Sequence, residues 1–393
     1  MTPAISLVIV SQKRPMELER AIASLSFQSI VNFEIIVVAD FPPMMKNIIV
    51  QDVRYFEFQE ANISRARNIG IAEARAQIVA FCDDDAIPDP HWLERLCAPF
   101  YTDNKLGAST GFCRGRNGIS YQWKGIGFSS TAKDFNLDIP IGAEPKIYEP
   151  RKDSYIKTIG TNCAFRKSAL HDVGGFDESF HYFLEDADIN LRLQQKGWKT
   201  AVVPQAEIIH NYKESRGRAR NRVPKTLYNL GASTHHFLKK HASDMRLENL
   251  ETFYKEQEDR LRNFFHLGLI RPKQIRALLR DLRRGVDGGA DRESKHPLEK
   301  IRSTRLSQMK PRELTLDLSL SEPRGQYDNR VPIHVKINPT TQATRLTFRR
   351  KGYWRITTGR FGRLDRSEPY WKYRSHETAM ARIKSFLEPR FTK

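Results

Sequence analysis

A short apolar run that ends in three consecutive carboxylates, Asp83, Asp84 and Asp85, most constrains how this chain folds. Residues 78–82, which precede them, are apolar without alternation, as is typical of a parallel strand covered on both faces. Open α/β sheets bind ligands at the carboxyl ends of their strands. The sequence therefore predicts a ligand-binding edge directly after residue 82.

Ionising three neighbouring carboxylates is costly unless a cation lies nearby. Hard oxygen ligands of this kind suit Mg²⁺ or Mn²⁺, which use one or two protein carboxylates together with phosphate oxygens of a substrate. A solvated acidic turn that caps the following helix explains the same residues without a metal. The three residues alone leave both interpretations open.

Strand and helix patterns alternate through the first third of the chain. Apolar runs at 5–10, 34–39 and 54–58 predict strands, and residues 15–28 and 63–75 carry apolar side chains at helical spacing. Repeated strand–helix units imply right-handed parallel crossovers. We therefore expect an α/β fold with a doubly wound, mostly parallel sheet.

Length, charge and cysteine content narrow the class of protein. The 393 residues suffice for two or three domains, and the formal charge of +19 points to a polyanionic or membrane-surface partner. The four cysteines form no Cys-x-x-Cys pair, which argues against a zinc site and favours a reducing compartment. The first apolar run predicts a strand rather than a signal peptide. We expect a cytoplasmic protein, with peripheral contact at the inner face of the membrane as an alternative.

Six short motifs in a fixed order give the chain a resemblance to a known family. They are Ser6-Leu-Val-Ile-Val-Ser, Glu34-Ile-Ile-Val-Val-Ala-Asp, Ala66-Arg67-Asn68-x-Gly70, Phe81-Cys-Asp-Asp-Asp, Gly174-Gly175-Phe176-Asp177 and Glu185-Asp186-x-Asp188. Over roughly residues 4–212 this order resembles the family 2 glycosyltransferases of GT-A fold. The resemblance implies transfer of a sugar from a nucleotide donor to an acceptor hydroxyl, with inversion and a divalent metal, Mn²⁺ or Mg²⁺.

The resemblance implies a donor site at the strand ends. Ser11 and Asp40 would hold the nucleoside, while Arg67 and Asn68 occupy the matching Ala-Arg-Asn positions. Arg67 would approach the base or the phosphates of the donor. A surface salt bridge on a helix is the structural explanation for the same arginine.

The resemblance also implies a metal site. Asp83 and Asp85 match the Asp-x-Asp of the family, with Asp85 the safer metal ligand, and both Asp83 and Asp84 would contact the donor sugar nucleotide. His210 stands where the family often has a histidine that helps to hold the metal. A lone histidine is also common in purely structural settings, so its role as a ligand stays open.

A second acidic pair, Glu185 and Asp186, begins a segment with a helical pattern. The helix dipole favours carboxylates in a first turn, which accounts for one of them without chemistry. Inverting transfer needs a carboxylate that takes the proton from the attacking hydroxyl. By its match to the family, Asp186 would be this base, and Glu185 would orient the acceptor or the helix.

The remainder of the chain is more basic. We divide the sequence into a glycosyltransferase domain (1–223), a basic helical extension (224–285), a linker (286–310) and a small basic β-rich module of unknown role (311–393). The basic helices could lie on an anionic membrane, which would suit a lipid-linked acceptor, or present a solvated face. For the last module we expect an acidic glycan rather than nucleic acid as a partner, and we expect that its deletion leaves donor hydrolysis intact.

These patterns favour an inverting enzyme that moves a hexosyl or deoxyhexosyl group from a nucleotide-diphosphate donor to a glycan or lipid-linked acceptor. Gln194-Gln-Lys-Gly-Trp198 lacks the Gln-x-x-Arg-Trp signature of processive polymer synthases, so single or limited transfers are expected. The alternative is a non-catalytic nucleotide-binding scaffold with a polyanion-binding tail. The presence of Asp186 favours the enzyme, because binding alone needs no base opposite the donor.

Overall fold

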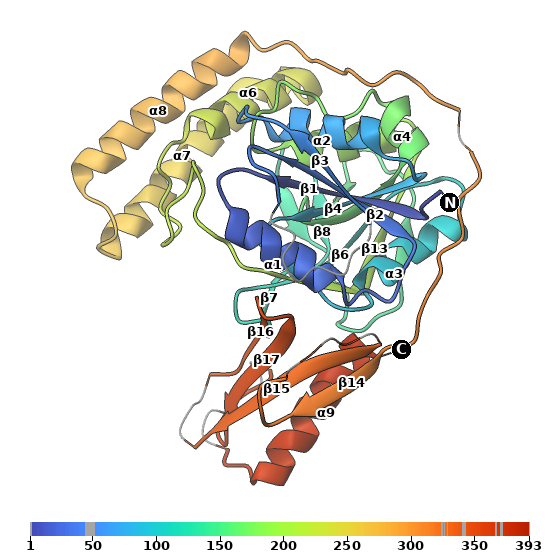
Figure 1. Cartoon of the computed structure of the whole chain (residues 1–393). Coiled ribbons are helices and arrows are strands. Elements are labelled where there is room, and N and C mark those ends of the chain that lie inside the picture. The colour runs from blue at the N-terminus through green and yellow to red at the C-terminus, as the bar shows by residue number, and fades with distance from the viewer. Residues whose placement is uncertain are drawn as a thin grey trace.

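A ten-stranded, mostly parallel sheet lies at the centre of the molecule, with a helical arm on one side and a separate β-rich unit below it (Figure 1). The computed structural model describes residues 2–43, 52–302, 304–323, 325, 327, 329–339, 343–365, 368–369 and 372–392.

The order of the main strands is β10-β13-β6-β12-β4-β1-β2-β3. The parallel strands are β1 (Ile5–Ser11), β2 (Phe33–Ala39), β3 (Val53–Glu57), β4 (Ile78–Asp83), β6 (Leu106–Arg114) and β13 (Lys199–His210). Antiparallel β12 (Asn162–Arg166) lies between β4 and β6, antiparallel β10 (Lys146–Tyr148) pairs with β13, and the short strands β5 (Ala86–Pro88) and β7 (Tyr121–Trp123) extend the sheet. The expected doubly wound, mostly parallel sheet is confirmed.

Helices cover both faces of this sheet. One face carries α1 (Pro15–Leu25), α3 (Trp92–Cys97) and the short 3-10 helix η1 (Ala98–Tyr101), and the other carries α2 (Ile63–Glu73), α4 (Lys167–Asp172) and α5 (Glu185–Gln195). The central strands are apolar on both sides because each side packs against a helix layer. The carboxyl ends of β1, β2 and β4 meet at one edge, where the predicted donor and metal residues lie.

The segment between β6 and β12 forms a small accessory sheet. Its strands are β8 (Ile126–Phe128), β9 (Asp134–Asn136) and β11 (Tyr155–Lys157), in the order β11-β8-β9. Phe128 and Tyr155 of this sheet pack against α5 in one apolar cluster. The loosely patterned stretch of the sequence is therefore ordered and rests on the helix that begins with Glu185 and Asp186.

The helical arm consists of α6 (Tyr228–His241), η2 (Ser243–Met245), α7 (Arg246–His266) and α8 (Pro272–Ala290). Glycines let α6 and α8 approach closely: a Cβ on Gly285 would lie 2.1 Å from the carbonyl oxygen of Tyr228. Helix α8 continues to Ala290, so the predicted boundary at residue 285 falls inside a helix. In the part of the chain that the structure describes, no helix is long and apolar enough to cross a membrane.

The predicted linker follows α8 as an extended segment along the outside of the sheet domain (Figure 1). Its backbone is hydrogen-bonded to that domain at several places: the amide of Lys295 donates to Asp177 at 2.9 Å, the hydroxyl of Tyr101 donates to the Ser307 carbonyl at 2.7 Å, and the amide of Val31 donates to the Lys310 carbonyl at 3.1 Å. These contacts fix the segment, although its composition is that of a linker.

The carboxyl-terminal unit is a four-stranded sheet covered by one helix. Its strands are β14 (Thr315–Ser319), β15 (Arg330–Asn338), β16 (Arg345–Arg349) and β17 (Tyr353–Gly359), ordered β14-β15-β17-β16, and its helix is α9 (His376–Phe391). The apolar core of this unit includes Phe27, Ile87 and Ile209 of the sheet domain. The two units therefore share one core, which argues against the expectation that the module can be deleted without effect.

A buried charge network closes the same interface. The guanidinium of Arg390 donates to both carboxylate oxygens of Asp89 at 2.8 Å and lies 3.3 Å from Glu207. Arg114 pairs with Glu207 from the other side, and Tyr121 donates a further hydrogen bond to Glu207. Asp89 is 1% exposed and Arg390 is 5% exposed. Each buried charge of this network thus has a partner of opposite sign.

Candidate active site

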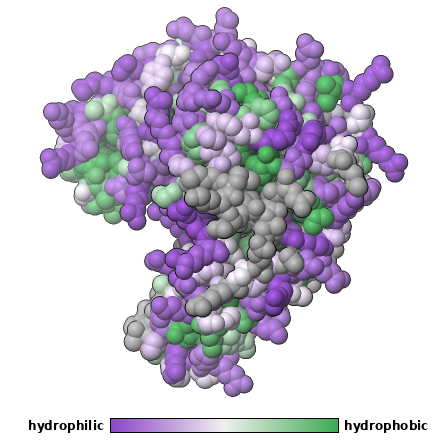
Figure 2. Space-filling view, in the orientation of Figure 1, coloured by the Kyte–Doolittle hydropathy of each residue, from purple (hydrophilic) through white to green (hydrophobic). Residues whose placement is uncertain are grey.

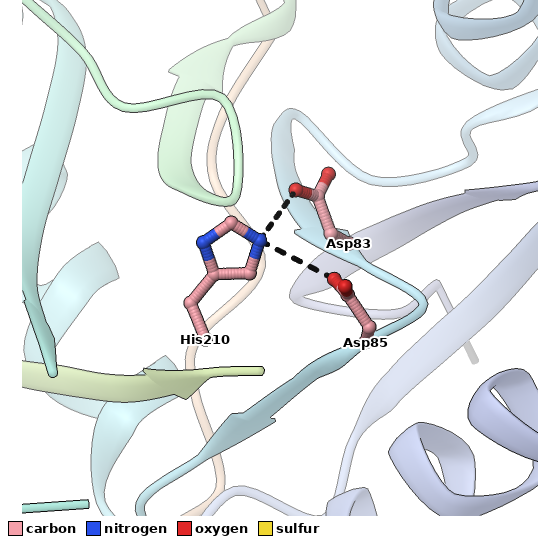
Figure 3. A group of neighbouring side chains, drawn as sticks. All are labelled: Asp83, Asp85 and His210. Atoms are coloured by element: carbon pink, nitrogen blue, oxygen red, sulfur yellow. Dashed lines mark ion pairs between the residues drawn. The ribbon is translucent and has the colours of Figure 1, made fainter. Parts of the chain in front are cut away.

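Three potential metal ligands converge at the carboxyl end of β4. Strand β5 pairs with the end of β13, with Ala86 opposite His210, and this pairing carries the histidine to the acidic turn. The Nε2 atom of His210 lies 3.3 Å from Asp85 and 3.7 Å from Asp83 (Figure 3). One ligand atom from each of the three residues lies within 4.8 Å of the others. The structure thus brings together the three side chains that the sequence predicts as metal ligands.

Asp85 is held as a carboxylate. Burial opposes its ionisation, but the hydrogen bond and charge of His210, the charge of Arg14 and the backbone amide of Lys213, at 2.7 Å, hold the pKa of Asp85 well below its usual range. The side chain of Asp83 is about one-third exposed, at 34%. A buried ionised ligand beside an open one is a suitable arrangement for a hard divalent cation that also binds substrate oxygens.

Asp84 has a different environment from its two neighbours. It is fully buried, accepts a hydrogen bond from the Ser11 hydroxyl at 2.5 Å and pairs with Arg14 at 2.6 Å. Burial raises the pKa of Asp84 to about 8. These contacts tie the ends of β1 and β4 together. Contact of Asp84 and Ser11 with the donor stays a prediction.

Two further predicted contacts of the donor sugar nucleotide, Asp40 and Asn68, lie at different depths. Asp40 stands at the partly exposed end of β2, where it accepts a hydrogen bond from the backbone amide of Lys13 at 2.9 Å. Asn68 is buried, and its side chain both donates to the carbonyl and accepts from the amide of Phe176, each at 2.9 Å. Asn68 therefore holds the turn at Gly174 to Asp177, while Asp40 is accessible to a ligand. Donor binding by either residue stays a prediction.

Arg67 is the link between the two acidic centres. It is 5% exposed, donates to Glu185 at 3.1 Å and lies over the rings of Phe81 and Phe176. Burial opposes its charge, but Glu185 and, with smaller effects, Asp83 and Asp186 raise the pKa of Arg67. The guanidinium is thus buried and paired with Glu185 at the start of α5, which excludes a surface salt bridge.

Glu185 and Asp186 begin α5 as predicted, but they differ in their partners. The pKa of Glu185 is raised by burial, against the opposing charge of Arg67. Asp186 accepts only from the neighbouring amide of Ala187, at 2.8 Å, and forms no ion pair with any described residue. The two residues before the helix, Phe183 and Leu184, have φ values of 72° and 66°, a strained conformation for non-glycine residues. Within the described residues Asp186 thus has no ion-pair partner, although its charge acts on Lys157 and Arg67.

The sequence analysis missed a group of arginines around Tyr212. The ring of Tyr212 lies 4.2 Å from the ring of His210, and the guanidinium groups of Arg222, Arg218 and Arg116 lie 4.4, 5.7 and 5.9 Å from the Tyr212 ring. Burial and the charges of its neighbouring arginines lower the pKa of Arg116. Among the residues that the structure describes, no carboxylate forms an ion pair with these three arginines. The basic run after His210 was the available signal.

Comparison with known proteins identifies the part of the chain that carries the acidic turn of this site. The family model for "Glycosyl transferase family 2" matches residues 6–174, which is less than half of the chain. Residues 6–174 are a family 2 glycosyltransferase domain. The match confirms the predicted family and covers the acidic turn after β4, while Glu185, Asp186 and His210 lie beyond its end.

Two relatives with assigned names are glycosyltransferases of Mycobacterium tuberculosis. The chain is 42% identical over 59 residues to an N-acetylglucosaminyl-diphospho-decaprenol L-rhamnosyltransferase, covering 15% of this chain and 19% of the relative. It is 30% identical over 152 residues to a pre-mycofactocin glycosyltransferase, covering 38% of this chain and 30% of the relative. The aligned segments thus span less than a third of either relative.

The chain also aligns in part with solved structures. The crystal structure of GalNAc-T7 with UDP, GalNAc and Mn²⁺ aligns with a TM-score of 0.46 and 18% sequence identity. The alignment covers 60% of this chain and 47% of that chain.

Proposed function

We propose that this protein is an inverting, non-processive glycosyltransferase that moves a sugar from a nucleoside-diphosphate donor to an acceptor hydroxyl. The observation that carries the proposal is the arrangement of two acidic centres about one buried guanidinium. Arg67 interacts with the charge of Asp83 in the metal group and with the charges of Glu185 and Asp186 at α5. This edge of the sheet could stabilise a leaving group that departs as an anion, and it could also accept the proton of the attacking hydroxyl.

The residues of the metal group fit a Mn²⁺ or Mg²⁺ ion. Asp83, Asp85 and His210 offer two oxygen ligands and one nitrogen ligand that already converge, and Asp85 is ionised. A bound divalent cation would neutralise negative charge on the departing diphosphate. The ring of His210 packs in one cluster with the rings of Tyr212 and Trp123, whose centroids lie 4.2 and 5.8 Å from its own. This packing fixes the imidazole without using its Nε2 atom.

The arginines around Tyr212 suit the diphosphate of the donor. Guanidinium groups bind phosphate oxygens through paired hydrogen bonds, and Arg116, Arg218 and Arg222 are not neutralised by carboxylates of the described chain. Arg116 donates to the carbonyl of Asn211, the residue after His210, at 2.6 Å, so the cluster lies close to the metal group. We assign this cluster to the phosphates on the donor side.

Asp186 is the proposed base. Its carboxylate takes the proton of the acceptor hydroxyl as the hydroxyl oxygen bonds to the anomeric carbon and the bond to the diphosphate breaks. Attack from the face opposite the leaving group inverts the anomeric configuration. Glu185 is bound to Arg67 and holds the first turn of α5, which orients Asp186. The division of roles follows from the partners: Glu185 has a cation, whereas Asp186 is free to accept a proton.

The acceptor is a glycan or a lipid-linked saccharide. The name of the rhamnosyltransferase relative describes a saccharide on a lipid diphosphate, which supports the second class. Peripheral contact with an anionic membrane through the basic helices belongs to the same proposal, because a lipid-linked acceptor is delivered at such a surface.

Ligand-induced stabilisation tests the proposal without knowledge of the acceptor. The unfolding temperature of the full chain would be measured with a panel of nucleoside diphosphates and nucleotide sugars, with and without Mn²⁺, since a ligand of the native state raises it by mass action. We expect a Mn²⁺-dependent rise with one nucleotide family, and no such rise for Asp85→Asn. A folded protein that responds to no nucleotide in the panel would support the non-catalytic scaffold instead.

A further inference from the structure

Helix α8 lies on the outside of the helical arm (Figure 1) and carries a row of exposed cations. The row consists of Lys273, Arg276, Arg280, Arg283 and Arg284, whose spacing of three to four residues places them on one side of the helix. The opposite side, with Leu278, Leu282 and the close-packed glycines, contacts α6 and the interior of the arm. Packing of the arm thus leaves the basic side of α8 to face solvent.

These cations are not neutralised by the protein. None of the five forms an ion pair with a carboxylate in the described ranges of the chain, although Arg262 on the neighbouring α7 pairs with Glu258 at 2.7 Å. Glu251 and Glu258 lie in the groove between α7 and α8, beside Arg283. An anionic partner must therefore approach from the outer side of α8 rather than from the groove.

The turn between α7 and α8 adds exposed apolar side chains at the end of this row. Leu267 is 71% exposed, Phe265 is 43% exposed and Leu269 is 40% exposed, whereas Ile270 is buried. Figure 2 shows a mostly hydrophilic face on which apolar groups gather over α7 and α8. An exposed apolar group of this kind marks a contact surface when it is bordered by charge.

The turn is well ordered by its own backbone. Gly268 has a φ of 68°, its amide donates to the Phe265 carbonyl at 2.8 Å, and the amide of Leu269 donates to the Phe264 carbonyl at 2.9 Å. Helix α7 thus ends in a glycine with left-handed backbone conformation, and Pro272 follows in the first turn of α8. Leu267 and Leu269 are therefore held outward by a defined turn rather than by a free loop.

We propose that the outer side of α8 and the α7–α8 turn dock this protein on an anionic phospholipid surface. The cations bind lipid phosphates, and the leucines and Phe265 insert among the acyl chains near the headgroups. Nucleic acid would use the same cations but has no use for the apolar turn, which is why a membrane is the better partner. The docking depends on the proposed function in one respect, because its purpose is to bring the enzyme to a lipid-linked acceptor.

Vesicle sedimentation with the full chain tests the docking. Wild-type protein should sediment with mixed phosphatidylglycerol and phosphatidylcholine vesicles and remain in solution with phosphatidylcholine alone. The triple change Lys273→Gln, Arg276→Gln and Arg280→Gln should lower partitioning about 100-fold, at roughly 1 kcal/mol for each cation. A matched triple change of exposed cations in the accessory region, Lys133→Gln, Arg151→Gln and Lys152→Gln, should leave partitioning within about twofold of wild type, because these cations lie outside the docking surface.

A second variant separates a membrane from other polyanions. Leu267→Ser should lower vesicle binding at least severalfold and leave binding to a single-stranded oligonucleotide unchanged. The proposal is overturned if both triple variants bind vesicles equally, or if the α8 variant loses only oligonucleotide binding. Nucleotide binding measured without vesicles tests the proposed function separately, so failure of one proposal is distinguishable from failure of the other.

Discussion

Two groups of arginines near the metal site differ in how their charge is balanced. Arg390 and Arg114 lie in the interface with the carboxyl-terminal unit, and each forms ion pairs with a buried carboxylate, Asp89 or Glu207. Arg116, Arg218 and Arg222 surround Tyr212 and have only carbonyl oxygens and an aromatic ring as partners in the described structure. The first group holds the protein together, whereas the second leaves positive charge available for a ligand.

The carboxylates Glu185 and Asp186 differ in the same way as the two groups of arginines. Glu185 is paired with Arg67, while Asp186 forms no ion pair within the described chain. We therefore propose that these two side chains of one sequence motif have different roles, Glu185 a structural one and Asp186 a chemical one. Charge that the fold leaves uncompensated indicates where substrate binds or reacts.

The largest effect is expected from Asp186→Asn. Loss of the proposed base should lower turnover by about 10²- to 10⁴-fold while Mn²⁺-dependent nucleotide binding persists. Steady-state rates of diphosphate release, combined with nucleotide affinity, measure both quantities. In Glu185→Gln we expect a smaller loss of turnover and a lower unfolding temperature, because Arg67 is left buried without its partner. Near-normal turnover in Asp186→Asn would remove this residue from the base role.

Arg390→Met tests the group of arginines that form ion pairs with buried carboxylates. Asp89 would remain buried without its cation, which should destabilise the protein by about 3–5 kcal/mol. Denaturant unfolding measures this change, and the exposed pair on α7 supplies the control: Arg262→Met should cost less than about 1 kcal/mol. The double variant Asp89→Asn with Arg390→Met should recover part of the loss. Equal costs at Arg390 and Arg262 would contradict the distinction.

Asp85→Asn tests the metal group. Mutation of residues that only hydrogen-bond to metal ligands typically lowers metal affinity about 10- to 100-fold. Loss of a buried ionised ligand should therefore reduce Mn²⁺-dependent nucleotide binding at least as much. Calorimetric titration with nucleoside diphosphate in the presence and absence of Mn²⁺ measures the effect. If the variant binds nucleotide with unchanged dependence on Mn²⁺, Asp85 is not a ligand.

The smallest effect is expected from Arg222→Gln, in the group of arginines around Tyr212 that has no carboxylate partner in the described structure. Loss of one charge-assisted hydrogen bond should weaken diphosphate binding by roughly tenfold, and this difference should shrink as salt is added. Stability should change by no more than about 1 kcal/mol, because the side chain loses its contact with the Tyr212 ring but no carboxylate partner. A clear loss of stability with unchanged nucleotide affinity would make Arg222 a structural residue.

Local patterns were sufficient to predict the sheet and the position of the acidic turn. Uninterrupted apolar runs define β1, β2 and β4, and the carboxyl end of β4 had to place Asp83 and Asp85 at the ligand-binding edge. His210 could be joined to them only through the family resemblance. The contact depends on the pairing of β5 with the end of β13, which no periodicity encodes.

Contacts between distant segments could not be predicted. Arg390 and Asp89 are 301 residues apart, and nothing near either residue identifies the other. The apolar residues Ile87 and Ile209 read as ordinary strand positions, yet they pack against the carboxyl-terminal unit. The sequence therefore suggested a separable module, and we now expect that deletion of residues 311–393 exposes this core and destabilises the glycosyltransferase domain.

Release of nucleoside diphosphate from a panel of nucleotide sugars tests the central claim most directly. The full chain would be assayed with Mn²⁺, with EDTA and as Asp186→Asn, beside candidate glycan and lipid-linked acceptors. We predict release from one donor family that requires the metal, rises with a matching acceptor and falls by about 10²-fold or more in Asp186→Asn. Release that is the same with EDTA, or the same in Asp186→Asn, would contradict a metal-assisted transfer with Asp186 as the base.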